Sequence, residues 1–166
     1  MAGARGRLSR HHEPPLDDTL TDLAVYAGLF ASAFTSATLL PGSSEAVLIA
    51  LLAAGQGDAG LLVIVATVGN ALGSCVNWVL GRFFSSFRDR HWFPVDEQSC
   101  ERAAAWFRRY GAWSLLLSWL PIIGDPLTAV AGALRVGLLR FLVLVSLGKA
   151  ARYMFVLGAF NWWGGA

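Results

Sequence analysis

The chain has 166 residues, of which 55% are hydrophobic and only 14% are charged, and its formal net charge is +2. A soluble domain usually carries about a quarter charged residues, so this composition argues against a disordered chain, a nucleic-acid-binding protein and an ordinary cytosolic enzyme. It predicts a small integral membrane protein.

The charged residues divide the chain into a polar tail, an apolar block, a polar middle segment and a second apolar block. Residues 1–19 are predicted to form a disordered basic tail, and residues 20–166 a single membrane domain. The first apolar stretch, Leu20–Leu40, is long enough to cross a bilayer, which takes about 20 residues. The alternative is that Leu20–Leu40 lies along the membrane surface.

Two further stretches are predicted to cross the membrane. Ala59–Arg82 has no charge between its first residue and Gly81, and Phe141–Trp163 is long enough but carries Lys149 and Arg152. A helix of about 20 predominantly apolar residues is typical of a transmembrane span. These two stretches are therefore expected to be full spans.

Two other apolar stretches are shorter or interrupted, and they are predicted to be re-entrant hairpins. Ala46–Gly57 begins just after the pair Pro41-Gly42, and Gly111–Leu134 contains two prolines and an acid. Backbone groups freed by proline need protein or water around them inside a membrane. The expected hairpin breaks are Pro41, Gly42, Pro121, Gly124 and Pro126.

The middle segment is predicted to contain one amphipathic helix. Asp96 is placed to cap it, Arg108 and Arg109 lie in its last turn, and Gly111 follows as a stop. One interpretation places this helix in the membrane interface. The other is a solvated linker helix that packs on the protein.

The distribution of arginine predicts the orientation. Short loops rich in arginine stay in the cytoplasm, so the basic tail and the middle segment are both expected there. The first hairpin would then dip in from outside and the second from the cytoplasm. The C-terminus would lie outside, with Trp162 and Trp163 in the interfacial aromatic belt.

The two apolar blocks resemble each other, which indicates an internal repeat. Three matches keep the same order: residues 40–47 with 120–127, Gly69-Asn70-Ala71 with Gly148-Lys149-Ala150, and Val79-Leu80-Gly81 with Val156-Leu157-Gly158. The first repeat covers about residues 40–83, the polar segment 84–110, and the second repeat about 111–163. The predicted fold is an all-α integral membrane protein. It consists of an inverted repeat of re-entrant hairpin plus transmembrane helix, with an extra N-terminal helix and a central interfacial amphipathic helix. Such folds bind their substrates near the membrane midplane.

Each predicted hairpin carries one acid, at equivalent positions. Glu45 and Asp125 both stand four residues after a Leu-Pro pair. A carboxylate deep in a membrane costs several kcal/mol unless it is buried in protein, neutralised or functional. The two acids are therefore candidate proton carriers. The alternative is that each caps the helix after its proline.

Two bases on the third span are candidate anion ligands. Lys149 and Arg152 lie three residues apart and share one helix face, where they would pair with the acids or bind a phosphate headgroup. On the second span, Asn70 and Asn77 share a face, and they either line the cavity or bond between helices. Arg135 is expected to mark the cytoplasmic end of the third span.

No enzyme signature is present in the sequence. It has no nucleophile–base set, no phosphate-binding glycine loop, and no zinc spacing among its three histidines and two cysteines. No cofactor, no metal and no nucleic-acid partner is expected.

The hairpin motifs resemble those of the DedA family of VTT (SNARE-associated) domain proteins, and within it the small YqaA-like branch. The resemblance covers roughly residues 25–160. It rests on residues 40–47, Gly69-Asn70 with Leu80-Gly81-Arg82, residues 118–128, and Gly148-Lys149 with Arg152-Tyr153.

The resemblance implies two facing re-entrant hairpins in a bacterial inner membrane protein that moves lipids such as polyprenyl phosphate or phospholipid, coupled to the proton gradient. Glu45 matches the family's acidic position and Arg135 a basic one, which makes Arg135 a further candidate for anion binding. Better-studied branches have an arginine on each side of the second proline. Here those positions are Ser118 and Gly124, so Lys149 and Arg152 are expected to supply the missing charge.

Three functions remain open from the sequence. The first is a proton-coupled flippase for a lipid phosphate or similar amphipathic anion, with membrane lipids as partners and a homodimer as its expected assembly. The second is a small-ion transporter. The third is a structural or assembly protein whose buried charges only pair with one another.

Overall fold

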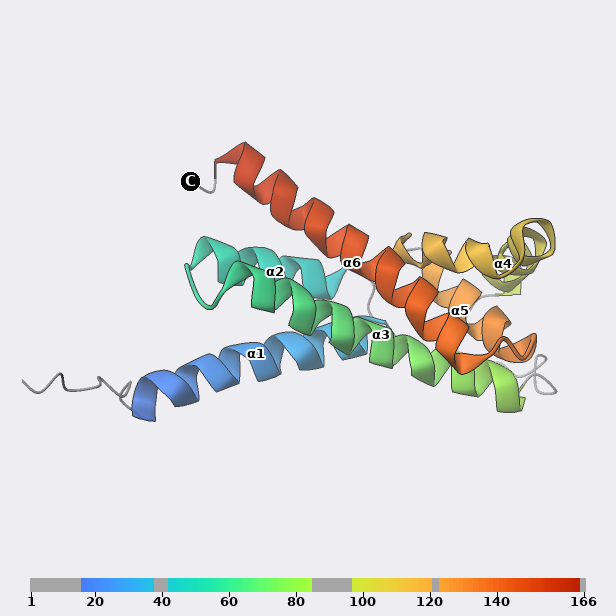
Figure 1. Cartoon of the computed structure of the whole chain (residues 1–166), viewed down its shortest axis with the longest axis horizontal. Helices are drawn as coiled ribbons and strands as arrows, with labels where there is room; N and C mark the ends of the chain where they lie inside the picture. The colour runs from blue at the N-terminus through green and yellow to red at the C-terminus, as the bar shows by residue number, and fades with distance from the viewer. Residues whose placement is uncertain (1–15, 38–41, 85–96, 121–122, 165–166) are drawn as a thin grey trace, which may run out of the picture.

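The computed structural model describes residues 16–37, 42–84, 97–120 and 123–164. Within these segments the chain is helical apart from short turns, so the predicted all-α class is confirmed. The elements are α1 (Leu16–Ser36), α2 (Ser43–Ala53), α3 (Ala59–Phe84), α4 (Glu97–Tyr110), the 3₁₀ helix η2 (Gly111–Trp119), α5 (Gly124–Ala133) and α6 (Leu138–Trp163). Figure 1 shows α1 and α2 toward one end of α3, and α4 and α5 toward the other.

The helices α3 and α6 form the frame of the molecule. Each has 26 residues, and within the described segments they are the two helices long and apolar enough to cross a membrane by length and composition. The Asp58 carboxylate accepts the Leu61 N–H at 2.8 Å and so caps the start of α3. The helices predicted over Ala59–Arg82 and Phe141–Trp163 are confirmed.

The first hairpin is formed by α1 and α2, which run antiparallel. At its closed end the Ser36 hydroxyl lies 3.1 Å from that of Ser44, and at its open end the Tyr26 hydroxyl accepts the Asp58 N–H at 3.0 Å. Gly42 precedes α2 with φ 93°, a left-handed conformation that glycine adopts at little cost.

The hairpin corrects the expectation for Leu20–Leu40. The helix ends at Ser36, whose hydroxyl lies 2.8 Å from Asn70 near the middle of α3, so α1 is one arm of a hairpin rather than a separate span. The physical reason is that an apolar hairpin arm has the same composition as an apolar span, so the sequence pattern does not distinguish the two. The bounds of the first repeat, residues 40–83, stay a prediction.

The second hairpin is formed by η2 and α5. Near its closed end the Leu116 carbonyl and the Ser118 hydroxyl pack on Gly148, close to the middle of α6. At its open end the Trp78 indole N–H donates to the Val136 carbonyl at 3.2 Å, near the C-terminal end of α3. The two hairpins thus flank the α3–α6 pair from opposite ends, in agreement with the order of the sequence repeat.

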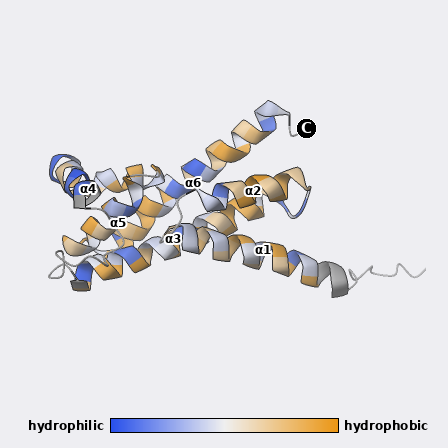
Figure 2. Ribbon diagram, turned by 180° about the vertical axis from the view of Figure 1, so that it is seen from behind, coloured by the Kyte–Doolittle hydropathy of each residue, from blue (hydrophilic) through white to orange (hydrophobic). Residues whose placement is uncertain are grey.

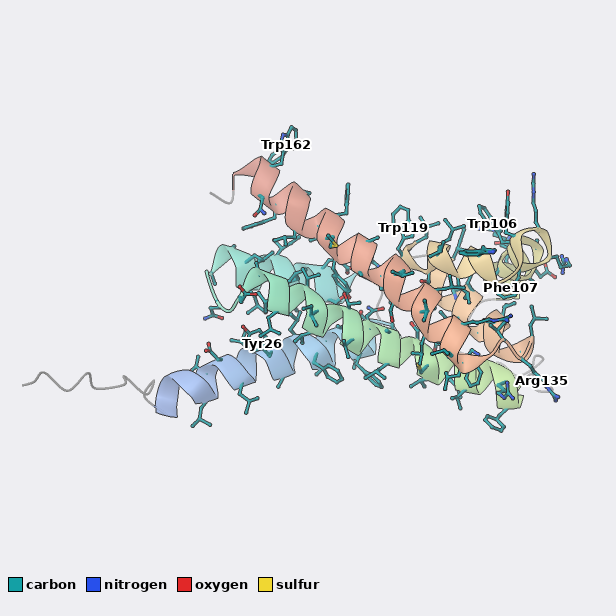
Figure 3. The ribbon with its side chains drawn as sticks, in the orientation of Figure 1. Tyr26, Trp106, Phe107, Trp119, Arg135 and Trp162 are labelled. Atoms are coloured by element: carbon teal, nitrogen blue, oxygen red, sulfur yellow. The ribbon has the colours of Figure 1, made fainter. Side chains whose placement is uncertain are left out.

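Helix α4 covers the second hairpin. Ala103 and Phe107 are buried in its core, whereas Trp106 and Tyr110 are exposed; Figure 3 labels Trp106 and Phe107 on this helix. Packing on the protein is thus confirmed for one face of the predicted amphipathic helix. Asp96, its predicted cap, lies outside the described residues.

The start of α1 and the helix α4 lie at opposite ends of α3 (Figure 1). The chain turns back after α1 at the middle of α3, so the start of α1 lies on the side away from α4. Most of the basic tail, residues 1–15, is outside the described part, and its expected location on the same side of the membrane as the middle segment stays a prediction.

Each hairpin has its own apolar core. One core contains Leu29, Ala33, Leu48, Leu62, Val63 and Ala66 together with the ring of Tyr153. The other contains Trp78, Ala103, Phe107, Leu115, Leu127, Ala131, Phe141 and Val145. The hairpin tips meet α3 and α6 between these cores, and buried polar side chains collect there.

The two repeats differ in how closely a neighbouring helix approaches the frame helix, α3 in one repeat and α6 in the other. A Cβ atom at Gly81 of α3 would collide with the Ala129 carbonyl of α5, and one at Gly132 of α5 with the Trp78 carbonyl of α3. Gly158 of α6 matches Gly81 in the sequence repeat, but a Cβ there would meet nothing within 4 Å. The backbones of α5 and α3 are thus in direct contact. The surface of α6 at Gly158 has no such neighbour among the described residues.

This difference predicts opposite outcomes for matched substitutions. Gly81→Ala forces the backbones of α3 and α5 apart, and we expect it to lower the free energy of unfolding by about 1–3 kcal/mol. Gly158→Ala adds helix propensity in open space and should leave stability unchanged or slightly raised. Thermal unfolding of the purified variants in one detergent measures both, and equal midpoints would contradict the packing described.

Candidate functional site

The candidate site lies at mid-length of α6, where Lys149 and Arg152 interrupt an otherwise apolar helix. Figure 2 shows this hydrophilic stretch midway along α6. The Lys149 side chain is almost completely buried, with 3% of its surface exposed. A charged side chain buried this deeply needs nearby compensation, and the structure brings four elements to it.

Arg152 pairs with Glu45 in the first turn of α2. The Arg152 Nε atom lies 2.5 Å from Glu45 Oε1, and both side chains are less than one-fifth exposed. Oε1 has no hydrogen-bond donor with suitable geometry, so charge rather than a directional bond holds this contact. The N-terminal cap of α2 is Gly42, without a side-chain cap bond. Glu45 is thus paired with Arg152, and its predicted role as a proton carrier stays a prediction.

Lys149 donates a hydrogen bond to the Asn70 side-chain carbonyl on α3. These two residues occupy equivalent positions in the sequence repeat, and they meet where α3 and α6 cross. Asn70 is therefore part of this cluster through a bond between helices. Among the described residues, Lys149 has no carboxylate within ion-pair distance, so its charge is only partly compensated.

Asp125 lies in the first turn of α5 and is close enough to interact electrostatically with Lys149, Arg152 and Glu45. Its carboxylate does not cap α5 and forms no ion pair within 4 Å in the described segments. The site thus joins two acids from two hairpins with two bases from one helix, and its formal charges sum to zero.

Three hydroxyl groups complete the site, and sequence reasoning missed all of them. Tyr153 Oη lies 2.9 Å from Ser44 Oγ and accepts the Asn70 amide at 3.0 Å, and Ser36 Oγ accepts the same amide at 2.8 Å. Tyr153 stands four residues after Lys149 and so shares its helix face. That spacing was the available signal.

A fourth hydroxyl lies at the tip of the second hairpin. Ser118 is 2% exposed, and its Oγ atom has no hydrogen-bond partner in the described segments. It packs beside Gly148, the residue before Lys149. Because a buried polar group without a partner is costly, this hydroxyl is available to a ligand next to the lysine.

Two predicted site residues lie elsewhere. Asn77 donates to the Ala37 carbonyl at 2.8 Å and ties the end of α1 to α3, so the helix-bonding alternative describes it. Arg135 is exposed just beyond the end of α5 (Figure 3), ten residues after Asp125, which corresponds to about 15 Å along a helix. Its expected part in anion binding is not supported by this position.

Two of the predicted hairpin breaks, Gly124 and Pro126, lie at the start of α5 beside Asp125. Gly124 is buried, and a Cβ atom there would collide with the Ser118 carbonyl, so the tip of the second hairpin requires glycine. Pro126 lies in the first turn of α5, where proline is tolerated. Pro41 and Pro121 lie outside the described residues.

A comparison with protein families finds one match. The VTT domain model matches residues 40–161, which include both acids, both bases, helix α3 and all but the last two residues of α6. The chain belongs to the VTT domain (DedA) family. Its relatives extend the match: the inner membrane protein YqaA of Escherichia coli is 45% identical over 139 residues, which cover 81% of this chain and 93% of that protein.

More distant relatives include one with a transport name. An uncharacterized protein of Haemophilus influenzae is 40% identical over 136 residues, covering 78% of this chain and 83% of its own length. Undecaprenyl phosphate transporter A of Staphylococcus aureus is 28% identical over 95 residues, covering 52% of this chain and 47% of that protein. No solved structure matches the chain.

The contact between Glu45 and Arg152 predicts coupled effects on stability. Glu45→Gln leaves a partly buried guanidinium without its counter-ion, and we expect it to lower the free energy of unfolding by about 1–3 kcal/mol. Glu45→Gln combined with Arg152→Gln removes both charges and should recover part of that loss. A double-mutant cycle of thermal unfolding in detergent measures the coupling. Additive effects of the two single substitutions would argue against the pair.

Proposed function

We propose that this protein is a transporter that moves a lipid phosphate, or a similar amphipathic anion, across the bacterial inner membrane together with protons. The observation that carries this proposal is the buried layer of two bases and two acids at the meeting point of two opposed hairpins. Substrate sites of inverted-repeat transporters lie at such points, near the membrane midplane.

The charge balance of the site supports coupling to protons. Glu45, Asp125, Lys149 and Arg152 together are formally neutral, so a bound anion would leave an uncompensated negative charge in a medium of low dielectric constant. One proton on a carboxylate for each charge of the anion restores neutrality. Glu45 and Asp125 are the proposed proton carriers, and Lys149 and Arg152 the proposed anion ligands.

Further donors suit an oxyanion. Lys149 has two ammonium hydrogens beyond the one given to Asn70, and the hydroxyl of Ser118 has no partner in the described segments. The start of α5 contributes partial positive charge near Asp125. A phosphate group has several acceptor oxygens and matches such a set of donors.

In the membrane we propose that α3 and α6 span the bilayer and that the two hairpins are re-entrant. The exposed arginines of α4, Arg102, Arg108 and Arg109, support a cytoplasmic location for that end by the positive-inside rule. The start of α1, Trp162 and Trp163 would then lie on the opposite side. Helices long and apolar enough to span the bilayer and the inner membrane relatives support a multi-pass location.

We propose a lipid phosphate in preference to a small anion, and the name of the Staphylococcus aureus relative supports this substrate class. If the four charges had only a structural role, their substitution would change activity only through the amount of folded protein.

Transport in proteoliposomes tests the proposal. With a fluorescent lipid phosphate, we expect the wild-type protein to give movement that a pH gradient accelerates, and Glu45→Gln to lose the acceleration at equal reconstitution. Lys149→Ala combined with Arg152→Ala removes the charged donors and should weaken the apparent affinity about tenfold or more.

Arg140→Ala is the matched control, because Arg140 is an exposed arginine on the same helix α6. It should transport like the wild type. Movement of chloride or inorganic phosphate without any lipid movement would favour the small-ion transporter. No transport of either kind by the wild type would overturn the proposal.

A further inference from the structure

A continuous row of hydrogen bonds joins Lys149 on α6 to Glu45 on α2. From Lys149 it passes through Asn70, then Tyr153, then Ser44. The last three steps measure 3.0, 2.9 and 3.3 Å between donor and acceptor atoms. The row therefore connects a proposed anion ligand with a proposed proton carrier on another element.

Chemistry fixes the direction of the first steps. An ammonium group can only donate, so the atom of Asn70 that faces Lys149 must be its carbonyl oxygen. The amide nitrogen then faces Tyr153 and Ser36, and since it can only donate, both hydroxyls accept from it. The phenol of Tyr153 has one hydrogen, which is left for Ser44.

The same reasoning fixes the last step. Ser44 accepts from Tyr153, and its own hydrogen has two acceptors in reach, the Ser36 hydroxyl and the Glu45 carboxylate. A charged acceptor forms the stronger bond, so Ser44 donates to Glu45. Every donor in the row thus points from Lys149 toward Glu45, and aligned bonds of this kind strengthen one another.

We propose that Tyr153 is a positioning residue that links the protonation of Glu45 to the availability of Lys149; this rests on the proposed transport function. Protonation removes the negative charge that Ser44 points to and that Arg152 pairs with. The row then loses its common direction, and the Asn70 carboxamide holds Lys149 less firmly. Both bases become available to an anion in the same step.

The row transmits orientation and carries no proton from end to end. The carboxamide of Asn70 is not an acid or a base in this range, so the proton on Glu45 comes from solution and returns there. The other titratable groups that face these residues are Arg152 on α6, Asp125 on α5 and Cys75 on α3. Tyr153→Phe leaves all three in place and removes one hydroxyl.

Tyr153→Phe is compared with Tyr26→Phe in the proteoliposome assay. Tyr26 is the matched control, since its hydroxyl also joins two elements but lies at the open end of the first hairpin. We expect Tyr153→Phe to lose most of the acceleration that a pH gradient gives, measured as the ratio of its rates with and without the gradient. Tyr26→Phe should keep the wild-type ratio. A Tyr153→Phe protein with a lower rate but the wild-type ratio would mean a structural role and overturn the proposal.

A second measurement does not depend on transport. The infrared band of the protonated Glu45 carboxyl, assigned by its disappearance in Glu45→Gln, is followed against pH. Because Tyr153→Phe removes one hydrogen bond from the row, the titration of the Glu45 carboxyl in this variant should be displaced by about half a pH unit or more. The Glu45 titration in Tyr26→Phe should superimpose on that of the wild type. If the Glu45 carboxyl titrates in Tyr153→Phe as it does in the wild type, the proposed link between Glu45 and Lys149 is overturned.

The two measurements separate the two proposals. A displaced titration in a protein that moves no lipid phosphate supports the row and overturns the transport function. A displaced titration together with a lost gradient response supports both. If Tyr153→Phe does not reconstitute, Ser44→Ala interrupts the same row one bond further along and must give the same pair of results.

Discussion

The burial of the Lys149 ammonium is the constraint on which the rest of this structure depends. A cation with 3% of its surface exposed is stable only if the surrounding elements bring polar groups to it. The crossing of α3 and α6 supplies Asn70, the first hairpin supplies Glu45 through Arg152, and the second supplies Asp125. Each hairpin must reach the middle of the molecule for this layer to exist.

The apolar packing also allows each hairpin to reach the middle of the molecule. Each hairpin has a separate hydrophobic core, and the polar layer lies between the two cores. Glycines allow the close approach that brings the tips inward: Gly148 admits the end of η2, while Gly69 and Gly73 admit the backbone of α1. Small residues at helix contacts are the usual means by which membrane helices pack closely.

Much of this fold was predictable from the sequence. The long apolar runs identified α3 and α6, and the matching Leu-Pro motifs placed Glu45 and Asp125 at equivalent hairpin positions. The match of Asn70 with Lys149 was also visible. The contact between Asn70 and Lys149 could not be predicted, because a repeat in the sequence does not show which of its matching residues meet in the folded protein.

Other features could not be predicted, for identifiable reasons. The helix α1 has the composition of a transmembrane span. Only its contacts with α2 and Asn70 show that it ends near the middle of α3. Tyr153 in an apolar helix resembles an ordinary core residue, since its ring does lie in the core and only its hydroxyl joins the site. Arg135 was selected by family resemblance, which carries no information about distance.

The distribution of charge between the elements has a consequence for motion. Both bases are on one continuous helix, so they keep a fixed separation whatever the hairpins do. Each acid sits at the tip of a different hairpin, and the two tips approach from opposite ends of the frame. A shift of either hairpin therefore moves one acid relative to both bases, while the backbone that carries the other acid stays in place. The site has one rigid positive side and two negative groups that can move independently.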